Sequence, residues 1–148
     1  MRLSLEELVL VRCRAAVQEP GILTTLGQHF KRLKKMDLSD NDCLGDKELG
    51  AMLASCKSLS SLRLSRCRGL TDMVVASIIH SCQGLESIDI TRCDGITTEA
   101  VFALVLGSPK LRQLGVEEHT ISKVTRKLTS RKKIVIMKSK SKDFLFKI

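Results

Sequence analysis

Six cysteines and three histidines are among the side chains in this 148-residue sequence that could bind a metal ion or act as nucleophiles. A structural zinc site needs pairs of such ligands at short spacing. No C-x-x-C pair occurs, and His80-x-Cys82 is the nearest approach to one. We therefore expect no metal centre and no cofactor in this chain.

Recognisable catalytic motifs do not occur either. The sequence has no G-x-S-x-G, H-E-x-x-H, phosphate-loop or dinucleotide-binding glycine pattern. His29, His80 and His119 fall at different phases of the repeat that organises the chain, so we expect them not to converge on one face. We therefore expect a protein that is not an enzyme.

The elements that must position these side chains recur with a period of about 26 residues. Five segments follow the pattern apolar-x-x-apolar-x-apolar, and their first residues are 28, 26, 26 and 26 positions apart: Leu5, Leu33, Leu59, Leu85 and Leu111. Each segment alternates like a β-strand and is followed by a turn and an amphipathic helix that opens on capping residues such as Thr71 and Thr97. Such units bury their apolar face only by stacking on one another.

The cysteines follow this period. Cys13, Cys67 and Cys93 each lie eight residues after the first leucine of a unit, and Cys56 and Cys82 close their units. A small side chain with a weak S–H donor suits a tight turn that faces the core. At the two other turns the position holds Asn41 or His119, which we expect to bond backbone amides there. Cys43 belongs to neither set, so we expect it to be exposed.

The segments LSSLRLSRCRGLTD at 59–72 and LESIDITRCDGITT at 85–98 resemble leucine-rich repeats of the cysteine-containing subtype. The resemblance implies an α/β, right-handed solenoid of the ribonuclease-inhibitor kind, with parallel strands on a concave face and helices on a convex face. We expect about five repeats and a shortened C-terminal rung over residues 1–137, followed by a basic tail at 138–148.

In that family, the repeats of F-box proteins recognise the targets of cullin-type ubiquitin ligases. The resemblance therefore implies a protein-interaction module that recognises such targets through its concave face. No F-box precedes the first repeat, so we expect the chain to be part of a longer protein, and any ligase adaptor to bind a region outside this sequence. A scaffold or regulatory protein without a ligase role is the alternative.

Strand alternation identifies the candidate binding residues on the concave face, because equal positions of adjacent parallel strands form columns. They are Lys35, Asp37, Arg63, Arg66, Asp89, Thr91 and Arg92. Asp37, Arg63 and Asp89 form one column, which we interpret as an exposed ion-pair ladder that keeps the exposed sheet soluble. Arg66 and Arg92 have no partner in their own column, which favours a patch that recognises an acidic peptide.

The net charge of +9 comes entirely from the C-terminal segment. Residues 1–122 hold 15 Lys/Arg and 15 Asp/Glu, whereas residues 123–148 hold ten Lys/Arg and one acid. We interpret the basic residues as a cap beside a final edge strand at 134–137. Tethering to nucleic acid or a membrane surface is the alternative, although the chain has only four aromatic residues. The basic candidates are Arg131, Lys132, Lys133, Lys138, Lys140 and Lys142.

The sequence has no apolar run of 18 residues and no signal-peptide pattern at its start. Free thiols that look buried favour a reducing compartment. We therefore expect a cytoplasmic or nuclear protein whose partner is another protein, with neither nucleic acid nor a membrane as its main partner.

Overall fold

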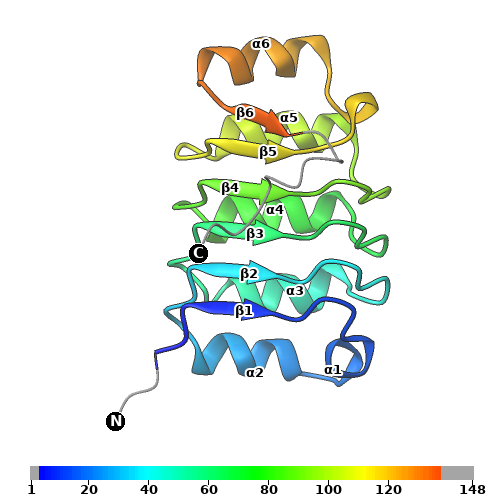
Figure 1. Cartoon of the computed structure of the whole chain (residues 1–148), viewed down its shortest axis with the longest axis vertical. Coiled ribbons are helices and arrows are strands. Elements are labelled where there is room, and N and C mark those ends of the chain that lie inside the picture. Colours follow the sequence, from blue (N-terminus) through cyan, green and yellow to red (C-terminus); the bar gives the residue numbers. More distant parts are fainter. Residues whose placement is uncertain (1–3, 138–148) are drawn as a thin grey trace.

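The computed structural model describes residues 4–137, which form a stack of strand–helix units (Figure 1). A single sheet holds six parallel strands in sequence order. The strands are β1 (Glu7–Val9), β2 (Lys35–Asp37), β3 (Ser61–Arg63), β4 (Ser87–Asp89), β5 (Gln113–Gly115) and β6 (Val135–Met137). The helices are α1 (Arg14–Gln18), α2 (Ile22–His29), α3 (Asp46–Leu53), α4 (Asp72–Ser81), α5 (Thr98–Gly107) and α6 (Lys123–Arg131), with a 3-10 helix, η1 (Glu118–Thr120).

This arrangement confirms the predicted α/β repeat architecture of the leucine-rich-repeat kind. Consecutive strands pair in register, so that Leu8, Met36, Leu62, Ile88 and Leu114 lie side by side at the strand centres. Helices α2 to α5 also stack on one another in sequence order. The predicted final edge strand is confirmed as β6, which pairs with β5.

The core lies between the sheet and the helices. The apolar residues of the inner strands, such as Met36 and Leu62, are completely buried. Their counterparts in the first unit, Leu5, Leu8 and Leu10, are only partly buried, because β1 has a neighbouring strand on one side alone among the described residues. Since burial of apolar area supplies about 25 cal/mol per Å², the first unit contributes less to stability than an inner one.

A hydrogen-bonded ladder of aspartates and threonines joins the helix starts of successive repeats. The Asp46 carboxylate accepts hydrogen bonds from Thr71 N at 2.8 Å and Thr71 Oγ1 at 2.6 Å. One repeat later, Asp72 accepts from Thr97 N at 2.7 Å and Thr97 Oγ1 at 2.6 Å. The two threonines also cap their own helices, because their side chains accept from backbone N–H groups in the first turn.

The first unit departs from this regularity at Pro20–Gly21. The segment that is one helix in later repeats is divided here into α1 and α2. Gly21 has φ +77°, a left-handed conformation that glycine adopts without steric cost. This break accommodates the two extra residues of the first unit. No helix among residues 4–137 is long and apolar enough to cross a membrane.

Candidate functional site

Helices α3, α4 and α5 pack behind the strands (Figure 1). Because the central strand residues Met36, Leu62 and Ile88 are buried on that side, strand alternation places the candidate strand residues on the opposite face. We call this the open face, since no helix of the described part of the chain covers it. Strand pairing places Asp37 beside Arg63, Arg63 beside Asp89, and Asp89 beside Gly115. The predicted column of charged residues is therefore present.

Arg63 lies between two carboxylates in this column. Its Nη1 is 3.8 Å from Asp37 Oδ2, and its Nε is 3.7 Å from Asp89 Oδ2. The expectation that this ladder is exposed was wrong, because Asp37 and Asp89 are only 7% and 4% exposed. Each carboxylate accepts a hydrogen bond from the backbone N–H of the residue two positions later in the chain. Asp37 accepts from Ser39 N at 3.0 Å, and Asp89 accepts from Thr91 N at 2.9 Å. The ladder is a fixed part of the fold.

Asp89 is the more deeply buried of the two carboxylates in the column. Burial raises the pKa of its carboxyl group above the ordinary value, although hydrogen bonds from Thr91 N and Thr91 Oγ1 and the charge of Arg63 oppose this shift. Its neighbour in the column has to be small, because a Cβ atom added to Gly115 would lie 2.8 Å from Asp89 Oδ1. Thr91, another candidate residue, is buried and also bonds Ser65 Oγ at 2.9 Å.

Arg66 and Arg92 both have ionic partners. The prediction that Arg66 has none in its own column was wrong, since Asp40 lies in that column, whereas the partner of Arg92, Glu117, lies in the neighbouring column. Arg66 Nη1 lies 3.5 Å from Asp40 Oδ1, and Arg92 Nε lies 3.8 Å from Glu117 Oε1. Both arginines follow their strands at positive φ, 61° and 56°, as does Asp40 at 62°. This left-handed turn directs each side chain toward an adjacent repeat. Both side chains stay about half exposed, at 49% and 53%.

The remaining open-face candidate, Lys35, is partly buried on β2 and pairs in register with Ser61. The open face thus brings together all seven predicted residues over three repeats. Asp37, Arg63 and Asp89 form one carboxylate–guanidinium ladder, and Arg66 and Arg92 each pair with a further carboxylate and stay about half exposed.

The turn cysteines form a second ladder beneath this face. Cys67 Sγ donates to Leu38 O at 3.1 Å, and Cys93 Sγ donates to Leu64 O at 2.9 Å. Asn41 holds the same position and donates from Nδ2 to Leu10 O at 2.8 Å. The expected contacts with backbone amides are therefore corrected to contacts with backbone carbonyls, since a thiol or amide N–H is the donor.

Burial raises the pKa of Cys67 to about 11 and those of Cys82 and Cys93 to about 12. These thiols are protonated at neutral pH, and a thiol rather than a thiolate is a poor nucleophile and metal ligand. Cys43 is exposed, as predicted. Residues 4–137 contain no group of three or more His, Cys, Asp or Glu side chains that could hold a metal ion.

His119 does not continue the turn ladder. The fifth unit has one residue fewer between its first leucine and its helix cap than the third and fourth units, namely Leu111 to Ser122 against Leu59 to Thr71. The chain forms η1 there, and His119 lies exposed on it. The expectation that the His119 side chain bonds the backbone was therefore wrong, because no such hydrogen bond is present within residues 4–137.

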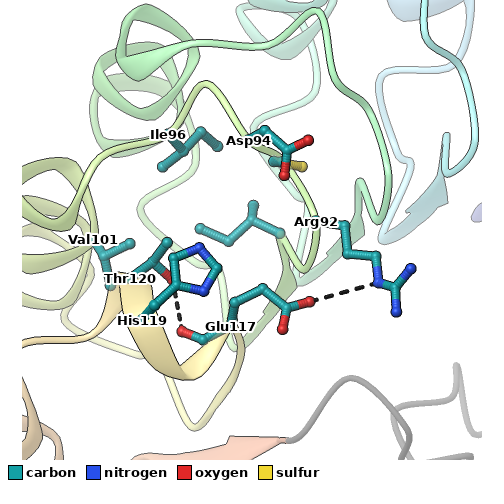
Figure 2. A pocket seen from close by; sticks show the side chains of 9 residues that line it. Arg92, Asp94, Ile96, Val101, Glu117, His119 and Thr120 are labelled. Carbon is teal, nitrogen blue, oxygen red and sulfur yellow. Dashed lines mark hydrogen bonds and ion pairs between the residues drawn. The ribbon is translucent and has the colours of Figure 1, made fainter.

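A cavity of about 80 Å³ lies at this irregular turn, between the ends of β4 and β5 (Figure 2). Its buried apolar lining is Ile90, Cys93, Ile96 and Val101, and its polar lining is Arg92, Asp94, Glu117, His119 and Thr120. Sequence analysis did not identify this site. The signal that could have revealed it is the missing residue in the fifth turn, because a shorter turn cannot fill the same space.

The basic C-terminal candidates have different roles. Lys132 Nζ donates to Val105 O at 2.6 Å, which satisfies a carbonyl in the last turn of α5. Arg131 is exposed at the end of α6, and Lys133, two residues later, has φ 59°. Lys138, Lys140 and Lys142 lie outside the described residues.

No protein-family model matches the chain, and no curated protein matches it significantly. The fold assignment therefore depends on the repeat and on the six-stranded parallel sheet that it forms. Any more specific assignment has to come from the chemistry of the open face.

Proposed function

We propose that this chain is a protein-interaction module that binds an acidic segment of a partner protein through its open face. The arrangement of Arg66 and Arg92 is the observation that supports this proposal. Each guanidinium is held by one carboxylate contact from an adjacent repeat, while half of its side chain remains exposed. A guanidinium has five N–H donors, so each arginine retains donors for a partner carboxylate.

The burial of Asp37 and Asp89 supports a binding surface of fixed shape. Their carboxylates are held by backbone hydrogen bonds and by Arg63, so the centre of the open face needs no rearrangement before a partner binds. A preorganised surface loses less conformational entropy on binding. The recognition residues of the proposal are therefore Arg66 and Arg92 at the rim, with the ladder as their support.

We further propose that the partner is a target of an F-box-type ubiquitin ligase, and that the protein acts in the cytoplasm or nucleus. The resemblance of the two central repeats to those of F-box proteins supports this assignment. A scaffold or regulatory protein that uses the same face is the alternative. The two differ in the fate of the partner, which accumulates on depletion of this protein only if it is a ligase target.

Charge reversal tests the binding surface. We expect Arg66→Glu/Arg92→Glu to abolish capture of the specific partner from cell lysate. Lys47→Glu/Lys57→Glu is the matched control, because it makes the same change in net charge at exposed residues away from the open face. Equal loss of capture in both variants would contradict the proposal. Loss only in Lys138→Ala/Lys140→Ala/Lys142→Ala would assign binding to the basic tail.

A further inference from the structure

The cavity beside η1 has an unsatisfied hydrogen-bond acceptor. Glu117 Oε1 is buried, and no described residue donates a hydrogen bond to it. Arg92 Nε, its ionic partner, is 3.8 Å away, which is too far for a hydrogen bond (Figure 2). A buried carboxylate oxygen without a donor costs free energy, so a ligand that donates to it would be stabilised.

The carbonyl of Ile90 is a second candidate acceptor. In earlier repeats the carbonyls of Leu10, Leu38 and Leu64 each accept a side-chain donor from the next turn. Ile90 is the next residue in this series and lines the cavity. Within residues 4–137 its carbonyl accepts from Cys93 N at 3.2 Å, but no side chain of the fifth turn donates to it. The cavity thus lies where the fifth repeat lacks the side-chain donor that Asn41, Cys67 and Cys93 supply in the earlier repeats.

The rest of the lining restricts the ligand further. The inner wall is apolar and buried, so the part of the ligand that enters must have an aliphatic section. Of the charged lining residues, Asp94 and Glu117 are acidic and Arg92 is basic, and Asp94 also lies 3.9 Å from Arg68 Nε. The volume exceeds that of a single water site, so a short alkyl chain has room to enter. These features fit an ammonium group at the end of an unbranched alkyl chain.

We propose that this cavity binds the alkylammonium end of a lysine side chain, which donates to Glu117 Oε1 and to the carbonyl of Ile90. The proposal rests on the proposed function where the lysine belongs to the partner protein. A partner segment that carries both a carboxylate and a lysine would replace the long Arg92–Glu117 ion pair by two intermolecular pairs. The other source of the same group is a lysine of this chain at 138, 140 or 142.

Titration of the full-length protein with n-butylammonium, followed by NMR, tests the site without the partner. We expect saturable shifts at the methyl groups of Ile90 and Val101 and at the amides of Glu117 and Thr120. The neutral analogue n-butanol, at matched ionic strength, should bind at least about tenfold more weakly, since hydrogen bonds to charged groups are roughly twice as strong as neutral ones.

Three variants test whether n-butylammonium binds at the cavity. Glu117→Gln should weaken n-butylammonium binding about tenfold, whereas Glu86→Gln, the same charge change at an exposed residue on the opposite end of the strands, should leave it unchanged. Arg92→Gln should strengthen binding, because it removes the competing cation. This opposite effect keeps the proposal testable if Glu117→Gln folds poorly.

The proposal is overturned if the shifts do not saturate, if n-butanol binds equally well, or if Glu86→Gln weakens binding as much as Glu117→Gln. Tighter n-butylammonium binding in Lys138→Ala/Lys140→Ala/Lys142→Ala would support the site and identify the chain's own lysines as competitors. Failure of this titration leaves the capture experiment on Arg66 and Arg92 unaffected, so the two proposals can fail separately.

Discussion

At the scale of single residues, the carboxylate of Asp89 is buried and also forms an ion pair with Arg63. It accepts hydrogen bonds from Thr91 N and Thr91 Oγ1 and lies beside Arg63 on the open face. Desolvation nevertheless outweighs these contacts and raises its pKa. Buried charges of this kind contribute little to stability and are better explained by the geometry that they impose. Here they hold Arg63 in the centre of the face.

This raised pKa makes the contribution of Asp89 to stability depend on pH. The folded state binds a proton at Asp89 more readily than the unfolded chain, so stability from this group increases as pH falls through the raised pKa toward 3.8. We expect the free energy of unfolding of the wild type, relative to Asp89→Asn, to be higher near about pH 4.5 than near about pH 7. Urea denaturation at the two pH values measures the difference. Asp42→Asn, at an exposed residue, controls for loss of a carboxylate, and a pH-independent difference for Asp89→Asn would contradict the assignment.

At the scale of elements, the aspartate–threonine ladder links each helix start to the next. Asp72→Ala removes both hydrogen bonds to Thr97 and an acidic group from the first turn of α4. We expect a loss of about 1–3 kcal/mol in the free energy of unfolding, since hydrogen bonds to charged groups contribute about 1.5–3 kcal/mol and this site is partly exposed. Asp72→Asn keeps one acceptor oxygen and should lose less. Thermal or urea unfolding measures both, and a loss no greater than that of Asp42→Ala would show that the ladder does not stabilise the stack.

The end of α6 offers a stabilising change at the same scale. Lys133 N donates to Ser130 O and Ile134 N donates to Thr129 O, which is the Schellman pattern that favours glycine at the residue with positive φ. We expect Lys133→Gly to stabilise the protein by about 0.5–1 kcal/mol. Lys127→Gly, in the interior of α6, should instead destabilise it by about 0.5–1 kcal/mol. A change of the same sign in the two variants would contradict the argument.

At the scale of the whole molecule, the 26-residue period was sufficient to predict the strand order and the register, and the apolar run at 134–137 predicted the final edge strand. The period carries this information because each strand repeats the same inward and outward positions as its neighbour. It places Asp40 beside Arg66, but it could not predict the partner of Arg92, because Glu117 lies in the neighbouring column. It could not predict the cavity either, since one missing residue changes the fifth turn into η1.

The linear stack also predicts where the molecule is most sensitive to mutation. Each repeat contacts its immediate neighbours, so a core residue between two repeats is packed on both sides and one in the first repeat is not. Leu62 and Leu8 hold the same position in their strands, but Leu62 is completely buried and Leu8 only partly. We expect Leu62→Ala to cost about 2–5 kcal/mol in the free energy of unfolding and Leu8→Ala clearly less. Equal costs in urea denaturation would mean that the first rung is packed as tightly in solution as the inner ones, as it would be if another surface, such as that of a second copy, covered it.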